Sequence, residues 1–317
     1  MPGLSSEGLA GIKLLVCMAK ADGVLRPAER FLLEDALAGL ALPEGLTASR
    51  LLEEDNDPQA LARSISTPEG RDYAYASVYA LAYCDRELAA AEERILEILR
   101  AEWGIGPQED EALRKALDKG QPGESFPPPA PAPAAVKEAG ARGSEFQKLL
   151  SRYALLTGLT GAIPVPLLPD LLVVPMQVKL IHDIAALFGL QTDKATVQLM
   201  FETLGVGTGV RLGVSGLCKM VPGWGSLVGA ASSFATTYAL GKVAWAFFES
   251  EGKRPLESFR PLFLAEHKQG KEEFKKHQAA LVESRRIHAK TLKALAYDLH
   301  QGKITQQQYE EKVDRLA

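Results

Sequence analysis

"VPGWGSLVGAASSFATTYALGKVAWAFFE", residues 221–249, is the stretch that decides the fold of this chain. No charged residue lies between Met220 and Gly241, a run as long as the roughly 20 residues that cross a bilayer. Its many Ser, Thr, Gly and Ala residues make it only weakly hydrophobic, and small residues four apart suit close helix contact in lipid or in protein. Two interpretations stay open, a membrane-seeking helical hairpin and a tightly packed soluble bundle. The packing or membrane positions are Gly225, Gly229, Ala235 and Gly241.

Together with "DLLVVPMQVKLIHDIAALFG" at residues 170–189, this stretch resembles the YcjF-type family of unknown function. Members of that family are often bacterial inner-membrane proteins encoded beside or fused to GTPases. The motif positions carried over are Asp170, Pro175, Gln177, Lys219, Pro222 and Gly223. The resemblance covers about residues 150–250 and implies a helical, membrane-related partner domain without known catalytic residues.

Charge divides the chain unevenly. Residues 1–118 contain 12 Lys and Arg against 22 Asp and Glu, whereas residues 119–317 contain 24 against 18. A nucleic-acid binder would have a strongly basic domain, so we expect no nucleic-acid partner. The mildly basic remainder suits an anionic lipid surface.

The three cysteines, Cys17, Cys84 and Cys218, are an odd number and lie far apart. This pattern argues against a disulfide framework and favours a reducing, cytoplasmic setting. Because the first basic residue is Lys13 and the early apolar stretch is short, we expect no signal peptide. Membrane contact is therefore expected from the middle of the chain, at the cytoplasmic face of the inner membrane.

The acidic N-terminal part, residues 1–118, shows the three-to-four spacing of amphipathic helices. It contains an internal echo, in which "KADGVLRPAERFLLEDAL" aligns with "YCDRELAAAEERILEIL". The pair resembles the TerB-like domain of tellurite-resistance TerB and the DjlA N-terminal region, in which the acidic pair has been connected with metal binding. The resemblance implies a divalent metal at Asp22, Glu29, Asp85 and Glu92. The alternative is that these carboxylates only cap helices and brace turns, because acidic side chains favour helix N-termini.

Residues 119–143 form the boundary of this domain. Six prolines lie between Pro122 and Pro133, and such a composition predicts an extended spacer.

No catalytic constellation emerges elsewhere. The glycine-rich "LGVGTGVRLGVSG", residues 204–216, lacks the GxGxxG spacing and follows a helical pattern, so it is not a dinucleotide site. His182 and Asp183 have no further ligand at metal spacing, and a polar helix face explains them better. We expect no cofactor, apart from the divalent metal above, and no enzymatic activity.

The C-terminal part is polar and helical, with a basic arm at 253–288. Its last segment, "LKALAYDLHQGKITQQQYEEKVDRLA", resembles the SHOCT short C-terminal domain. In the predicted hairpin Gly302 ends one helix, Thr305 caps the next and Ile304 staples the two. Two such short helices bury too little surface alone, so the hairpin should dock on something.

These observations predict an all-α chain: a TerB-like helical bundle (1–118), a Pro-rich linker (119–143), a YcjF-like Gly/Ala-rich domain (144–252), the basic arm (253–288) and a SHOCT-like hairpin (289–317). The expected function is a non-enzymatic, membrane-associated adaptor in bacterial envelope or stress physiology. Anionic lipid, further copies of the chain and a protein partner such as a GTPase are its expected partners. A soluble self-assembling structural protein with a fully protein-packed core is the alternative.

Overall fold

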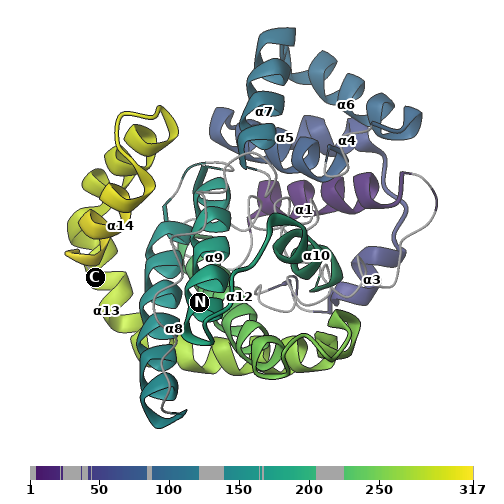
Figure 1. Cartoon of the computed structure of the whole chain (residues 1–317). Helices are drawn as coiled ribbons and strands as arrows, with labels where there is room; N and C mark the ends of the chain where they lie inside the picture. The colour runs from purple at the N-terminus through teal and green to yellow at the C-terminus, as the bar shows by residue number, and fades with distance from the viewer. Residues whose placement is uncertain are drawn as a thin grey trace. The chain divides into compact units, whose positions relative to one another are not determined.

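A computed structural model describes residues 5–21, 23, 37, 42–43, 45–83, 88–120, 139–163, 165, 168–204 and 225–316. Every regular element in these ranges is a helix, which confirms the all-α prediction (Figure 1). The chain divides into two compact units. The acidic unit contains the helices up to residue 118. The central unit contains the helices from residue 139 onward, including residues 229–249 of the stretch quoted first.

The helices of the acidic unit are α1 (Ser6–Ala19), α3 (Ala48–Glu53), α4 (Pro58–Ser64), α5 (Pro68–Ala82), α6 (Ala90–Trp103) and α7 (Pro107–Gly120). Four of them begin at a side-chain cap, because a hydroxyl or carboxylate oxygen accepts one of the first N–H groups that lack helical partners. The capping residues are Ser5, Thr47, Asp57 and Thr67.

Helix α1 is the core of the acidic unit. Its side chains at Leu14, Leu15 and Val16 are all buried although they point in different directions, because α3, α4 and α5 pack around it. The start of α1 is also tied down, since the Glu7 carboxylate accepts hydrogen bonds from the backbone N–H and the hydroxyl of both Ser66 and Thr67. These bonds lower the pKa of Glu7 to about 2.

A second polar cluster joins the later helices of the acidic unit. The Arg100 guanidinium on α6 contacts Asp110 of α7 at 2.6 Å, Glu93 at 2.7 Å and the Tyr75 hydroxyl of α5 at 3.1 Å. Nearby, the Trp103 indole N–H donates to the Ala62 carbonyl at 3.0 Å. Arg100 thus joins α6 to α5 and α7, and Trp103 joins α6 to α4. These contacts fix α4–α7 relative to one another.

The central unit contains α8 (Ala139–Gly161), α9 (Leu168–Leu187), α10 (Lys194–Leu204), α12 (Gly225–Glu249), the short 3-10 helix η1 (Leu256–Phe259), α13 (Arg260–His300) and α14 (Gln306–Asp314). Helices α8 and α9 lie side by side, and α13 contacts both of them as well as α10 and η1 (Figure 1). α9 ends at Leu187, and Gly189, two residues further on, has a left-handed backbone with φ of 71°.

Close approach between backbones organises the central unit around α12. A Cβ atom added at Gly161 of α8 would lie 2.7 Å from the carbonyl oxygen of Gly229, and one added at Gly270 of α13 would lie 2.9 Å from the Cα atom of Ala235. A Cβ at Gly241 would lie 2.6 Å from a methyl group of Leu150. Glycine is therefore required where α12 meets α8 and α13, because these contacts leave no room for a side chain.

Helix α13 is a single helix of 41 residues. It runs without interruption through residues 288 and 289, where the basic arm was expected to give way to the hairpin. The turn that follows was predicted well. Gly302 has a left-handed backbone with φ of 72°, and the Thr305 hydroxyl and Gln308 side chain form a capping box at the start of α14.

Candidate functional site

The predicted metal residues are only partly within the described chain. Asp22, Glu29 and Asp85 lie outside the described residues. Glu92 lies in the first turn of α6, where its carboxylate accepts the Ala89 N–H at 2.9 Å. Over the described ranges, no group of three or more His, Cys, Asp or Glu residues is placed to hold a metal ion. For Glu92 the structure therefore shows a helix-capping contact, and the metal site stays a prediction.

Only some of the predicted motif residues of the central unit lie within the described chain. Lys219, Pro222 and Gly223 lie outside the described residues, whereas Asp170 and Pro175 belong to α9, which continues through the proline. Gln177, also on α9, is fully buried.

Gln177 belongs to a hydrogen-bond network centred on Thr237 that links three helices. Its side-chain N–H donates to the Thr237 hydroxyl of α12 at 3.0 Å, and the Thr157 hydroxyl of α8 lies 2.9 Å from the same oxygen. Thr237 donates in turn to the Ser233 carbonyl at 2.8 Å. Buried polar groups need such partners, so these side chains hold α8, α9 and α12 in one arrangement.

The four packing or membrane positions all lie on α12. Gly225 is its first residue, and Gly229, Ala235 and Gly241 are buried. The atoms that cover these three positions belong to α8, α9 and α13. Of the two interpretations left open by the sequence, protein packing is the one that these three residues display.

His182 and Asp183 each have a protein partner. The His182 Nδ1 atom lies 2.5 Å from the Thr192 hydroxyl, and burial lowers the pKa of this imidazole. The Asp183 carboxylate accepts the Tyr153 hydroxyl at 2.8 Å. Both residues therefore serve local structure, as a polar helix face predicts.

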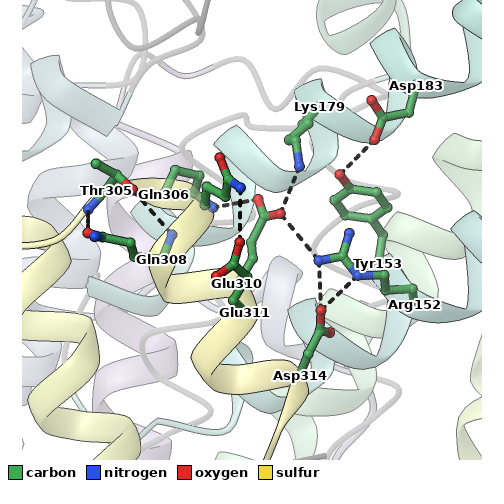
Figure 2. Close-up of polar contacts among 11 residues, drawn as sticks. Arg152, Tyr153, Lys179, Asp183, Thr305, Gln306, Gln308, Glu310, Glu311 and Asp314 are labelled. Atoms are coloured by element: carbon green, nitrogen blue, oxygen red, sulfur yellow. Dashed lines mark hydrogen bonds and ion pairs between the residues drawn. The ribbon is translucent and has the colours of Figure 1, made fainter. Parts of the chain in front are cut away.

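The feature that the sequence analysis missed is a charge cluster that joins α14 to α8 and α9 (Figure 2). Glu310 of α14 is only 1% exposed, and its carboxylate accepts a hydrogen bond from the Lys179 ammonium at 2.9 Å. The Arg152 guanidinium lies 3.6 Å from Glu310 and 2.7 Å from Asp314. The second Glu310 oxygen accepts the Gln306 side-chain N–H at 3.2 Å. The buried carboxylate therefore has partners on both oxygens, as burial of a charge requires.

The ring of Tyr153 packs against the two cations of this cluster. The Arg152 guanidinium and the Lys179 ammonium lie 5.3 Å and 5.6 Å from the centre of its ring, within the range of cation–π attraction. Burial and the neighbouring Asp183 raise the pKa of Tyr153, so the phenol stays protonated. Its O–H group donates a hydrogen bond to the Asp183 carboxylate. The two cations are thus held from both sides, by an aromatic face and by carboxylates.

An apolar contact lies beside the charges. Tyr309 is fully buried, and its hydroxyl lies 3.0 Å from the Thr160 hydroxyl of α8. Val313, one helical turn further along, is buried as well. Residues 306, 309, 310 and 313 share one helix face, so the position of Glu310 beside Tyr309 and Val313 was the signal in the sequence that it would be buried. The hairpin thus docks, as expected, and its docking surface belongs to the same chain.

Part of the chain is similar to a known protein. Over 115 residues, the chain is 29% identical to magnetosome membrane protein 22 of Magnetospirillum gryphiswaldense. The match covers 33% of this chain and 58% of that protein, so it spans little more than half of the relative. No protein-family profile matches the chain, and no solved structure matches it. The TerB-like, YcjF-type and SHOCT-like resemblances therefore stay predictions.

The surface of the described chain bears on membrane contact. None of the described helices combines the length and the apolar character that crossing a bilayer requires. Among the residues that the structure describes, five large apolar side chains are exposed, and three of them, Val282, Ile287 and Tyr297, lie on α13. Exposed apolar side chains gathered on one element mark candidate interaction surfaces.

Proposed function

We propose that this chain is a non-enzymatic scaffold that associates with a membrane surface. The observation that carries the proposal is the similarity to magnetosome membrane protein 22, whose name describes it as a membrane protein. The finer proposal places the chain at the cytoplasmic face of a bacterial inner membrane. There the acidic unit would serve as a docking domain for a protein partner, for which a GTPase is the candidate that the YcjF-type resemblance suggests.

Peripheral contact is the mode that we propose. Gly229, Ala235 and Gly241 are covered by other helices of the central unit, so lipid contact through α12 would require the unit to open. A folded central unit meets a bilayer with its outer side chains instead. Cations there attract anionic headgroups, and exposed apolar side chains enter the boundary between headgroups and acyl chains.

A second candidate is a soluble scaffold that assembles through protein contacts alone. The observation that favours it is the same close packing, since the deciding stretch finds its partners within the protein. The two candidates differ in one measurable property, the binding of lipid by the purified chain.

Vesicle co-sedimentation of the purified full-length protein tests the proposal. We expect the chain to pellet with vesicles of total bacterial polar lipid at low ionic strength, and to stay in the supernatant when vesicles are omitted. Protein that remains in the supernatant with and without vesicles would exclude the membrane scaffold and leave the soluble one. Fractionation of cells that express the chain provides an independent readout of the same property.

A further inference from the structure

We propose that the outer face of residues 282–297 on α13 is the lipid-binding surface of this chain, and that its ligand is an anionic bilayer. This proposal rests on the proposed function and adds the site and the class of lipid. We name residues 282–297 the outer face segment.

Helix geometry brings the relevant side chains together. At about 100° per residue, positions 282, 286, 290, 293 and 297 fall within one quarter of the helix circumference. All five are exposed, and the side chain of Arg286 is 71% exposed. Ile287, next to this stripe, is 60% exposed, the highest value among the large apolar side chains described. One surface therefore presents an apolar group beside three cations.

The opposite side of the same segment is fixed to the protein. Leu281, Leu292 and Leu295 are buried, and the Ser284 hydroxyl donates to the Leu316 carbonyl beyond the end of α14. The segment therefore cannot rotate its apolar side chains inward without losing these contacts. The exposure of Val282, Ile287 and Tyr297 is a consequence of this anchoring.

The charge balance of α13 differs along its length. In the first half, Lys275 and Lys276 lie 2.8 Å and 2.7 Å from Glu272 and Glu273, so their charges are neutralised within one turn. The outer face segment contains four Lys and Arg residues and one carboxylate, Glu283, which Arg286 contacts at 2.6 Å. Among the described residues, Lys290 and Lys293 have no carboxylate within ion-pair distance. Positive charge is thus concentrated where the apolar side chains are exposed.

This combination suits a bilayer better than an acidic protein surface. The Lys293 ammonium lies 6.0 Å from the centre of the Tyr297 ring, and both side chains pair an apolar body with a polar end. Such side chains place the polar end among the headgroups while the apolar part is buried. Ile287 has no polar end, so its exposure is relieved by the acyl region of a bilayer.

The test compares matched variants of the full-length chain in co-sedimentation with vesicles that contain phosphatidylglycerol and with vesicles of phosphatidylcholine alone. We expect K290Q/K293Q to weaken binding to the anionic vesicles about 25-fold, since each Lys near an anionic surface contributes a factor of about five. The control K275Q/K276Q changes the net charge equally, and we expect less than about a threefold loss because those charges are already paired.

A second pair of variants tests the apolar contribution. We expect Ile287→Asn to weaken binding about tenfold, because a partly inserted aliphatic side chain is lost. The control Leu199→Asn alters a side chain of α10 that is 48% exposed and lies outside the outer face segment, and it should leave binding unchanged. All four variants alter exposed residues, so their melting temperatures should match that of the parent.

The outcomes separate the two proposals. If the parent chain binds anionic vesicles and K290Q/K293Q binds them equally well, the surface is wrong and the membrane scaffold stands. If the parent chain binds neither kind of vesicle, both proposals fail. Equal binding to phosphatidylcholine alone would overturn the requirement for anionic lipid. If K290Q/K293Q keeps lipid binding but lowers the oligomer mass in light scattering, the segment is a protein interface between copies of the chain.

Discussion

Helices α12 and α14 are held against the same helix, α8, by opposite kinds of contact. Toward α12, α8 presents Gly158 and Gly161, and the contact depends on the absence of side chains. Toward α14 it presents Arg152, whose charge meets Glu310 and Asp314. The first contact depends on close approach of the backbones, supported by the neutral hydrogen bond between Thr157 and Thr237, whereas the second requires particular charged partners. Mutations and solution conditions should therefore affect the two contacts differently.

The largest expected effect is at the α8–α12 contact. We expect Gly161→Ala to lower the free energy of unfolding by about 2–3 kcal/mol, because its methyl group would overlap the Gly229 carbonyl and overpacking costs about that much. Gly143→Ala, on the same helix with open space around it, is the control. It should raise stability by up to about 1 kcal/mol through helix propensity. Urea unfolding measures both, and equal effects of the two variants would contradict the close α8–α12 contact.

The next effect concerns the α8–α14 contact. We expect Glu310→Ala to cost about 2 kcal/mol, below the usual 3–5 kcal/mol for a broken buried pair, because Lys179 and Arg152 are about one third exposed and can be hydrated. Glu311→Ala removes an exposed carboxylate from the same helix and should change stability by less than about 0.5 kcal/mol. Thermal melts of both variants give the comparison. A loss of similar size for Glu311→Ala would argue against the buried charge cluster.

The stability contributions of the two contacts should also differ in their dependence on salt. Screening acts on charges that water reaches, so 1 M NaCl should reduce the stability difference between Glu310→Ala and the parent. The deficit of Gly161→Ala involves no charge and should stay constant. Unfolding of both variants at low and high salt measures this. Equal salt dependence would show that the two contacts do not differ in kind.

The smallest effect is expected in the acidic unit, where Glu7 provides a charged contact near the surface. Its pKa of about 2 lies below the ordinary value, so its contribution is fully present above about pH 5 and is lost as the pH falls toward 2. Because the group is close to solvent, we expect a contribution of about 1 kcal/mol. Glu7→Gln should remove this part of the pH dependence, whereas Glu97→Gln, at an exposed position of α6, should not. Identical profiles for both variants would contradict the role of Glu7.

Local signals in the sequence predicted the features that depend on neighbouring residues. Gly302 follows the end of α13 because a left-handed backbone suits glycine, and Thr305 begins α14 because its hydroxyl accepts a hydrogen bond from a free N–H group. The Gly and Ala content of α12 likewise indicated close helix packing. It did not distinguish protein from lipid as the partner, since both accept small apolar surfaces.

The features that depend on distant residues could not be predicted in this way. Glu310 is separated from Lys179 by 131 positions, and nothing near either residue identifies the other. The closeness of Gly161 to Gly229 likewise depends on how α8 and α12 come together. Burial of a glutamate on a helix with Gln and Glu at most positions ran against its polar composition, and only its place beside Tyr309 and Val313 indicated it.

The contact between Lys179 and Glu310 also orders events during biosynthesis. At the usual rate of translation, about 5–20 residues per second, the 131 positions between them take on the order of 10 s to make. Throughout that interval the carboxylates that will hold Lys179 and Arg152 have not been made, so the two cations depend on water for their hydration. The contact of α14 with α8 and α9 therefore forms only after residue 310 has been made. A chain that stops before residue 310 leaves Arg152 of α8 and Lys179 of α9 without the carboxylates of α14.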